Sequence, residues 1–130
     1  MRGTVLLALL VAGCSSGIES YVAPVSAESG ARAAYDIADF VRTRLRPGEA
    51  IAVQAPTGDG VVGPDLANDL QTEGYVLEPD AKHKLAYVVS TIADGTYVRI
   101  QLDGIDAARL YHTFSGGMEP AGPFTVEDRS

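Results

Sequence analysis

The sequence predicts an α+β fold, a two-layer sandwich in which two helices pack on one face of a mixed sheet that ends in a three-stranded antiparallel meander. Two observations predict the helical layer, since apolar residues recur at helical spacing over residues 29–46 and a shorter helical pattern covers residues 64–73. A third predicts the sheet, since three runs rich in Val, Ile, Tyr and Thr fill the last third of the chain. The 130 residues are typical of one domain that can bury a hydrophobic core.

The first helix is expected over residues 29–46. Its apolar residues recur at intervals of three and four, which is the spacing of one buried helix face: Ala34, Ile37, Val41 and Leu45. Acidic Glu28 precedes the helix and its last turns are basic, an arrangement that the helix macrodipole favours. Pro47 and Gly48 then stop it.

A short strand is expected next, at residues 50–55, followed by a glycine-rich loop at residues 57–63. The second helix is expected over residues 64–73, because its first position, Pro64, is one that tolerates proline without losing a hydrogen bond. A second short strand follows at residues 75–78. Strands that alternate with helices in this way predict a partly parallel sheet.

The meander is expected in three runs, residues 85–92, 96–102 and 105–114. Asp-Gly pairs separate these runs and predict hairpins with type I′ turns, in which both central residues have positive φ. In the middle strand, Val98, Ile100 and Leu102 point to one face and the residues between them point to the other. This alternation predicts a sheet with one buried face and one exposed face.

The boundaries of the domain are expected on either side of these elements. We expect a flexible tether at residues 14–28, a single α+β domain at 29–126 and a disordered tail at 127–130. The tether sequence is small and polar, and the alternative is an extra strand at residues 21–25. The turn-rich segment from residue 115 is expected to be irregular, with Phe124 packed back onto the domain.

Composition limits the classes of function. Seventeen acidic residues against ten basic ones give a net charge of −7, which disfavours nucleic-acid binding because phosphate requires a positive surface. One cysteine excludes an internal disulfide, and two histidines disfavour a zinc site. We therefore expect no metal, no other cofactor and no direct contact with nucleic acid.

The N-terminus has the pattern of an export signal. Arg2 precedes an apolar run at residues 4–12, which is shorter than the roughly 20 residues of a membrane-spanning helix. Residues 10–14, Leu-Val-Ala-Gly-Cys, resemble the lipobox of bacterial lipoprotein signal peptides. The resemblance implies that residues 1–13 are a signal peptide and that Cys14 is lipidated. The alternative is an ordinary secreted protein with a chance cysteine.

The residue after the lipobox cysteine is serine, and similar lipoproteins that stay at the inner membrane have Asp there. The resemblance therefore implies an anchor in the outer membrane, with the domain facing the periplasm. Each buried acyl CH₂ contributes about 0.8 kcal/mol, so the three chains that this family carries hold a protein at a membrane without a transmembrane helix.

A dinucleotide-binding pattern occurs in the glycine-rich loop. Gly58, Gly60 and Gly63 match G-x-G-x-x-G, and Glu78 lies at the distance of the ribose-binding acid. The loop does not leave the strand at once, Pro64 removes an N–H group from the helix start, and the hairpins that follow exclude a doubly wound sheet. An ordinary loop is the favoured interpretation, and whether it binds anything stays open.

The two histidines do not lie in a catalytic motif. His83 is flanked by two lysines in an expected loop and is predicted to be solvated, whereas His112 lies in an expected strand. A hydrolase would need a serine and a carboxylate at one of them, and H-E-x-x-H is absent from the sequence. We therefore do not expect an enzyme.

The meander presents Tyr and Arg side chains. If the hairpin registers hold, Tyr97, Arg99, Arg109 and Tyr111 share one exposed surface with Tyr87. Tyr and Arg are enriched at protein interfaces, so this surface is a candidate for partner binding. The alternative is that the aromatic side chains stabilise the sheet across neighbouring strands.

Four segments resemble the conjugal transfer lipoprotein family TrbH. They are residues 85–92 (LAYVVSTI), 95–100 (GTYVRI), 107–111 (AARLY) and 116–125 (GGMEPAGPFT). The resemblance implies an assembly component of the mating-pair formation apparatus, a type IV secretion system that moves plasmid DNA between bacteria. It implies no catalytic residues, with Cys14 as the functional residue and other secretion-channel proteins as partners.

Two alternatives to this function remain. One is an envelope lipoprotein whose domain binds a small molecule or a cell-envelope polymer, and an apolar pocket with a few polar groups would favour it. The other is an envelope enzyme that uses a histidine, and a serine and a carboxylate within hydrogen-bond reach of His83 or His112 would favour it.

Overall fold

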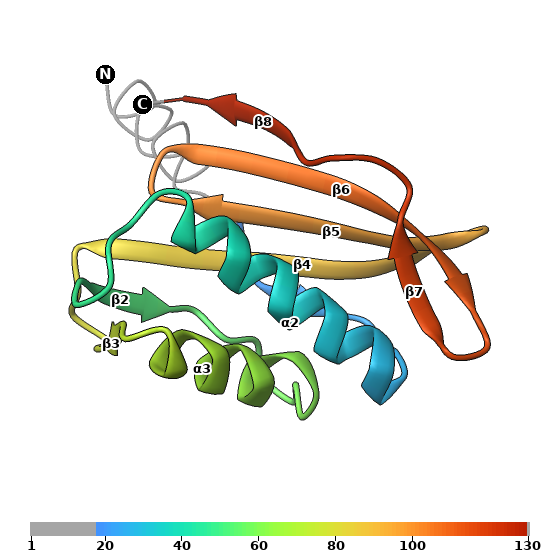
Figure 1. The fold of residues 1–130 in the computed structure, drawn as a ribbon, viewed down its shortest axis with the longest axis horizontal. Coiled ribbons are helices and arrows are strands. Elements are labelled where there is room, and N and C mark those ends of the chain that lie inside the picture. The colour runs from blue at the N-terminus through green and yellow to red at the C-terminus, as the bar shows by residue number, and fades with distance from the viewer. Residues whose placement is uncertain (1–17, 130) are drawn as a thin grey trace, which may run out of the picture.

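The computed structural model describes residues 18–129 and has two helices on one face of an eight-stranded mixed sheet (Figure 1). The elements are β1 (Tyr21–Val22), α2 (Ala27–Arg42), β2 (Ala50–Val53), α3 (Val62–Thr72), β3 (Val76–Leu77), β4 (His83–Ile92), β5 (Gly95–Leu102), β6 (Ile105–Phe114), β7 (Gly117–Pro120) and β8 (Thr125–Asp128). The strand order is β3-β2-β4-β5-β6-β7, with β1 paired to β4 and β8 paired to β6. The α+β fold expected from the sequence is confirmed.

Helix α2 begins two residues earlier and ends four residues earlier than its apolar pattern predicts. Ser26 caps its start, since the side-chain hydroxyl accepts a hydrogen bond of 3.1 Å from the backbone N–H of Ser29. The predicted apolar stripe is confirmed, because Ala34, Ile37 and Val41 are fully buried. The helix covers the sheet beside α3, which packs along it (Figure 1).

The expected tether is wrong for the part that the structure describes. Tyr21 and Val22 form β1, which pairs in parallel with Val88 and Val89 of β4, and Ala23 is buried. The physical reason is that β2 pairs only with the first residues of β4, which leaves the rest of that edge open to a second short strand. The alternative of a strand in this segment holds for Tyr21–Val22 but not for the rest of residues 21–25, and residues 14–17 lie outside the described part of the chain.

The meander is confirmed, with β4, β5 and β6 paired in antiparallel order. The turns differ from the prediction. Asp103, with φ 56°, is the one non-glycine residue with positive φ among residues 18–129, and Gly104 does not have positive φ. Neither the turn at residues 93–94 nor the turn at residues 103–104 is therefore type I′. Gly95 belongs to β5 instead, where an added Cβ would lie 1.9 Å from the backbone oxygen of Tyr111. This glycine permits a close approach of two strands rather than a turn.

The segment after β6 is ordered, so the expected irregular end and the disordered tail at residues 127–128 are wrong. Strands β7 and β8 pair with opposite halves of β6, which satisfies the backbone groups along its outer edge (Figure 1). The N–H of Arg129 donates to the carbonyl of Gly104 at 2.7 Å. Phe124 packs on the domain as predicted, with its ring centroid 5.6 Å from that of Phe40.

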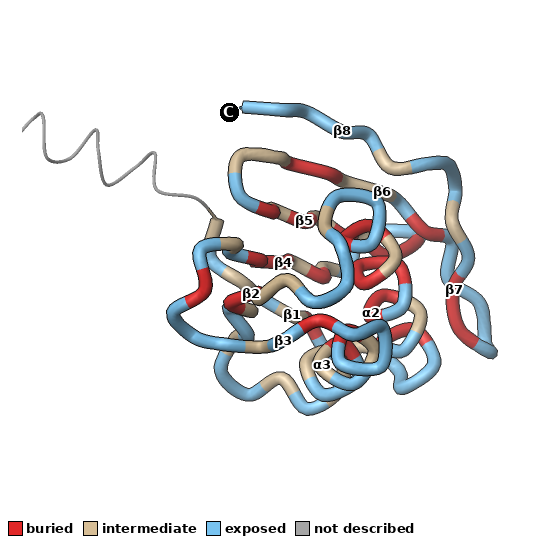
Figure 2. Tube along the Cα trace, turned by 60° about the vertical axis from the view of Figure 1, so that its left-hand side comes forward, coloured by how far each residue is buried: buried red, intermediate tan, exposed pale blue. Residues whose placement is uncertain are grey.

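The hydrophobic core lies between the helices and one face of the sheet. Buried residues follow the helix faces and alternate along β5, where Val98, Ile100 and Leu102 are at most 1% exposed (Figure 2). Both helices among residues 18–129 lie on this face, and neither of them lies over the opposite face of the meander (Figure 1). We call the face without helices the open face.

Candidate functional site

The four residues expected to form one surface lie on opposite faces of the sheet. The turn at Asp103 and Gly104 has two residues, so every even-numbered residue of β5 pairs with an odd-numbered residue of β6. Directly paired residues in an antiparallel sheet point to the same face. Arg109 therefore shares the helix-covered face with Val98, and Tyr97 shares the open face with Leu110.

The expectation of one shared surface is thus wrong. Tyr97 and Arg99 lie together on the open face, whereas Arg109 and Tyr111 lie on the helix-covered face. Tyr87 is also on the covered face and is fully buried. The register decides this result, because a turn with one more residue would have placed all four on the same side.

Tyr111 is a core residue with a buried hydroxyl. It is 2% exposed and donates a hydrogen bond of 2.6 Å to Oδ2 of Asp36 on α2. Burial raises the pKa of Tyr111, and the neighbouring carboxylate of Asp36 raises it further. A phenol held in this way stabilises the packing of helix on sheet and does not reach an external partner.

Arg109 ties three parts of the chain together. Its Nη1 lies 3.1 Å from Oδ2 of Asp36, and its Nε donates to the carbonyl of Gly122 at 2.9 Å. The guanidinium also lies over the ring of Phe124, 4.5 Å from the centroid. These contacts join α2, β6 and the segment before β8, so the geometry assigns Arg109 a structural role.

The open face contains a balanced cluster of charges at the Gln101 end. The carboxylate of Asp106 is buried and forms two ion pairs. Its Oδ1 lies 3.4 Å from Nη2 of Arg99, and its Oδ2 lies 2.8 Å from Nε of Arg129. The contact with Arg129 does not have the geometry of a hydrogen bond. Arg129 also lies 3.5 Å from Glu127. Gln101 donates to Asp106 at 3.3 Å, so two carboxylates and two guanidiniums neutralise one another here.

The first described residue lies at the same end of this face. The backbone N–H of Ile18 donates to Oε1 of Gln101 at 2.9 Å, and Ser20 accepts from the N–H of Tyr87 at 3.0 Å. The chain therefore enters the domain beside the Asp106 cluster.

Large apolar side chains gather on the open face, a feature that sequence reasoning missed. Within residues 18–129, four of the seven exposed large hydrophobic residues lie there, Tyr21, Ile92, Leu110 and Phe114, each 48–56% exposed. They come from three strands, and only the sheet register places them on the same face. The sequence shows an apolar residue at each of these positions. It does not show that they share a face, because the pairing of the strands decides this.

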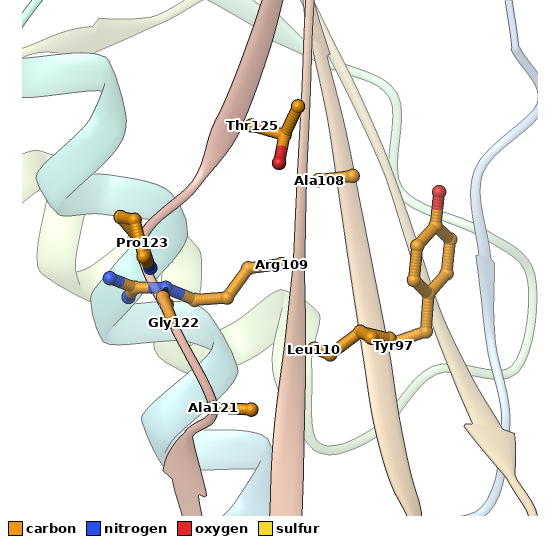
Figure 3. Close-up of a pocket in the computed structure, with 8 residues that line it drawn as sticks. All are labelled: Tyr97, Ala108, Arg109, Leu110, Ala121, Gly122, Pro123 and Thr125. Atoms are coloured by element: carbon orange, nitrogen blue, oxygen red, sulfur yellow. Dashed lines mark hydrogen bonds between the residues drawn. The ribbon is translucent and has the colours of Figure 1, made fainter.

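A hollow of about 480 Å³ lies on this face beside Tyr97 (Figure 3). Tyr97 forms one wall, and the segment at residues 121–125 forms the other. Ala108 and Leu110 of β6 lie between these walls, while Arg109 extends the other way, toward Gly122 and Pro123 (Figure 3). The Tyr97 ring therefore stands beside a depression whose opposite side is the segment at residues 121–125.

The glycine-rich loop is occupied by its own carboxylate. Asp59 accepts hydrogen bonds from the backbone N–H groups of Val61, Val62 and Gly63 at 3.0, 2.9 and 2.6 Å. These groups at the start of α3 are the ones that would bind a pyrophosphate. The side chain also accepts from the hydroxyl of Tyr87 at 3.3 Å. The loop therefore caps a helix, which also explains why α3 begins at Val62 rather than at Pro64.

His83 is not solvated as expected. Its Nδ1 lies 2.9 Å from Oδ2 of Asp103 and its Nε2 lies 3.2 Å from Oε1 of Glu49, so it bridges two carboxylates from distant segments. Glu49 also accepts from the N–H of Arg46, and this contact, with the neighbouring His83, lowers the pKa of Glu49. Because both ring nitrogens of His83 face carboxylates, neither faces a serine hydroxyl. His112 is exposed on β6.

The described residues offer neither a metal-binding cluster nor a membrane-spanning helix. Within residues 18–129, no group of three or more His, Cys, Asp and Glu side chains is placed to hold a metal ion. Among the helices of the same residues, neither α2 nor α3 is long and apolar enough to cross a membrane. Cys14, the expected lipidation site, lies outside them.

Comparison with known proteins identifies the family. The family model described as conjugal transfer protein TrbH matches residues 15–130. No curated protein and no solved structure matches the chain. The match covers every described element and agrees with the resemblance seen in the sequence. The chain therefore belongs to the TrbH family of conjugal transfer proteins.

Proposed function

We propose that this protein is an outer-membrane lipoprotein that acts as a non-catalytic assembly component of a conjugative type IV secretion system. The observation that carries the proposal is the family match over residues 15–130, which makes the chain a component of conjugal transfer. The match begins one residue after Cys14, at the start of the chain that a cut before the cysteine would leave. This boundary supports a protein that works in its processed form.

The anchor is a lipid on Cys14. The short apolar run, the small residues Ala12 and Gly13, and the cysteine directly after them form the pattern that a lipoprotein signal peptidase needs. Four positions separate Cys14 from Ile18, a span of at most about 14 Å. The domain therefore sits close to the lipid, with the Gln101 end of the open face nearest to it.

The protein acts through protein contacts on the open face. Tyr97 and Arg99 lie there with exposed apolar side chains around them, a composition typical of protein interfaces. Arg109 and Tyr111 support this surface from within, since their contacts hold α2 and the segment at residues 121–124 against the sheet. The secretion channel supplies the partners, and membrane attachment raises the local concentration at which they meet.

A complementation experiment tests this function. Donor cells that lack the gene receive the wild type, Cys14→Ser or the control Ser15→Ala, and plasmid transfer, membrane fractionation and labelling by palmitate are measured. We expect Cys14→Ser to lose the label, leave the membrane fraction and fail to restore transfer, while Ser15→Ala behaves as wild type. Unchanged membrane fractionation and labelling of Cys14→Ser would overturn the anchor. Full transfer without the gene would overturn the role in assembly.

A further inference from the structure

We propose that the open face is the interface of a homodimer, in which two copies of this chain pack sheet against sheet and Tyr97 of each copy fills the hollow of the other. The inference rests on the proposed function in one respect, since the shared membrane anchor decides how the two copies point.

The first argument is the composition of the face. Tyr21, Ile92, Leu110 and Phe114 are each about half exposed and lie on one side of one sheet. An exposed apolar surface of this kind, with polar groups around it, marks an interaction site. A sheet that has one face packed and one apolar face unpacked is the unit from which sheet-on-sheet packings are made.

The second argument is the charge of the face. At the Gln101 end, Asp106 and Glu127 are matched by Arg99 and Arg129 within the same chain. Covering charges that are already paired leaves none of them stranded, which is the main cost of burying ionic groups. The face therefore does not need a partner of opposite charge, and a second copy with the same balanced cluster is compatible with it.

The third argument is shape. The ring of Tyr97 stands beside a hollow of about 480 Å³ whose bottom is formed by Ala108 and Leu110 (Figure 3). A two-fold interface requires a surface that is complementary to itself, and a projection next to a depression meets this requirement. Within one chain, Tyr97 pairs with Leu110 in the sheet register. If the two-fold axis passes between β5 and β6, Tyr97 of one copy therefore lies opposite Leu110 of the second copy.

The direction of the axis follows from the anchor. Both copies enter the same membrane near Ile18. A two-fold axis parallel to the long strands keeps these two ends together, and it also sets Tyr97 of one copy opposite β6 of the second copy. An axis across the strands would separate the anchors by about 30 Å, the length of the ten-residue strand β4. The parallel axis places β5 over β6 of the second copy and β4 over its β8.

The size of the face sets the expected strength of the dimer. The three long strands together with β8 span roughly 20 Å by 30 Å, or about 600 Å² of sheet. A stable interface of standard size buries about 800 Å² on each partner, so this plane area belongs to the smaller interfaces, and side chains that stand above the sheet add to it. Attachment of both copies to one membrane raises the local concentration at which such a contact forms.

Cross-linking of the full lipoprotein in cells tests the interface. Two differently tagged copies are expressed together, one with Tyr97→Cys and one with Leu110→Cys, and the cells are treated with a bis-maleimide whose arm spans about 10 Å, the separation of two packed sheets. We expect a cross-linked species that contains both tags, and a second one from the pair Val88→Cys and Thr125→Cys. The control pair replaces Tyr97→Cys by Tyr35→Cys, which is exposed on α2, away from the open face, and is expected to give no such species.

A substitution separates this inference from the proposed function. Leu110→Glu in both copies is expected to reduce the Val88–Thr125 cross-link by at least about tenfold, because it places a charge in the interface. Absence of both cross-links, equal yield from the Tyr35 control, or cross-linking to a different protein instead would overturn the dimer. In that case, loss of plasmid transfer in Leu110→Glu with normal membrane fractionation would still support the proposed function, with another occupant on this face.

Discussion

Arg109 and Asp36 form an ion pair of 3.1 Å that joins strand β6 to the helix lying over it. The Asp36 side chain is 6% exposed and that of Arg109 is 19% exposed, so water screens this pair little. Arg32 and the hydroxyl of Tyr111 bind the same carboxylate oxygen, at 3.1 and 2.6 Å. The helix layer and the sheet thus meet around one carboxylate, and this arrangement predicts the stability of several variants.

Replacing this carboxylate is expected to destabilise the fold strongly. Asp36→Ala leaves a guanidinium and a phenol without their acceptor inside the protein, so the free energy of unfolding falls by about 3–5 kcal/mol, as measured by urea unfolding. The control is Arg32→Ala, which removes a partner that is 41% exposed and costs less than about 1 kcal/mol. An equal decrease in the free energy of unfolding in the two variants would show that the buried network contributes no more than an exposed ion pair.

The cap on α3 gives a second prediction. Asp59→Ala removes the acceptor of three backbone N–H groups, so the free energy of unfolding falls by about 1–2 kcal/mol. Asp65→Ala is the matched control, since Asp65 is an exposed acid in the first turn of the same helix, where its loss costs at most about 1 kcal/mol. A larger effect at Asp65 than at Asp59 would contradict the cap.

The close approach of β5 and β6 predicts the effect of adding one methyl group. Gly95→Ala would bring its Cβ to 1.9 Å from the backbone oxygen of Tyr111, so the strands must separate. The expected loss is about 3 kcal/mol in the free energy of unfolding, measured by thermal or urea unfolding. Gly60→Ala is the control, because nothing lies within 4 Å of its added Cβ, and a change within about 0.5 kcal/mol is expected. Similar values for both would mean that the strands adjust freely.

Two buried tyrosines predict a loss of stability at high pH. Burial raises the pKa of Tyr87 and of Tyr111, and each phenol also faces a carboxylate. The unfolded chain releases these protons at about pH 10 while the folded protein retains them, so the free energy of unfolding falls as the pH rises above about 10. Each tyrosine contributes about 1.4 kcal/mol per pH unit to this slope.

Tyr111→Phe isolates one of the two contributions. The variant is expected to lose about 1.4 kcal/mol per pH unit from the slope between pH 10 and 12, measured by urea unfolding at several pH values. Tyr35→Phe, at an exposed position on α2, serves as the control and is expected to keep the slope. A slope unchanged by Tyr111→Phe would mean that its hydroxyl is not buried in solution.

The sequence predicted the elements that carry a strong internal period. The apolar stripe of α2 and the alternating residues Val98, Ile100 and Leu102 of β5 are all buried in the core. Burial of one face requires an apolar residue every three or four positions in a helix and every second position in a strand, and this spacing can be read in the sequence. Strands β1 and β8 carry no such signal. They exist because β4 and β6 have unpaired edges, which is a property of the assembled sheet.

The candidate site was predicted less well, for a related reason. Tyr97 and Arg109 were assigned to one surface, and a two-residue turn places them on opposite faces. The turn length decides the parity of pairing, and the position of Gly95 in a strand rather than a turn was not readable from an Asp-Gly pair. Asp59 and His83 also contact residues that are distant in the sequence. No local sequence pattern predicts such tertiary contacts.

We propose above all that a lipid joined to the thiol of Cys14 holds this protein at the membrane where transfer takes place. Intact mass spectrometry of the protein purified from its native membrane measures it most directly. We predict a chain that begins at Cys14 and carries the added mass of a diacylglycerol group and one further acyl chain. An unmodified chain that still begins at Met1 would contradict the claim.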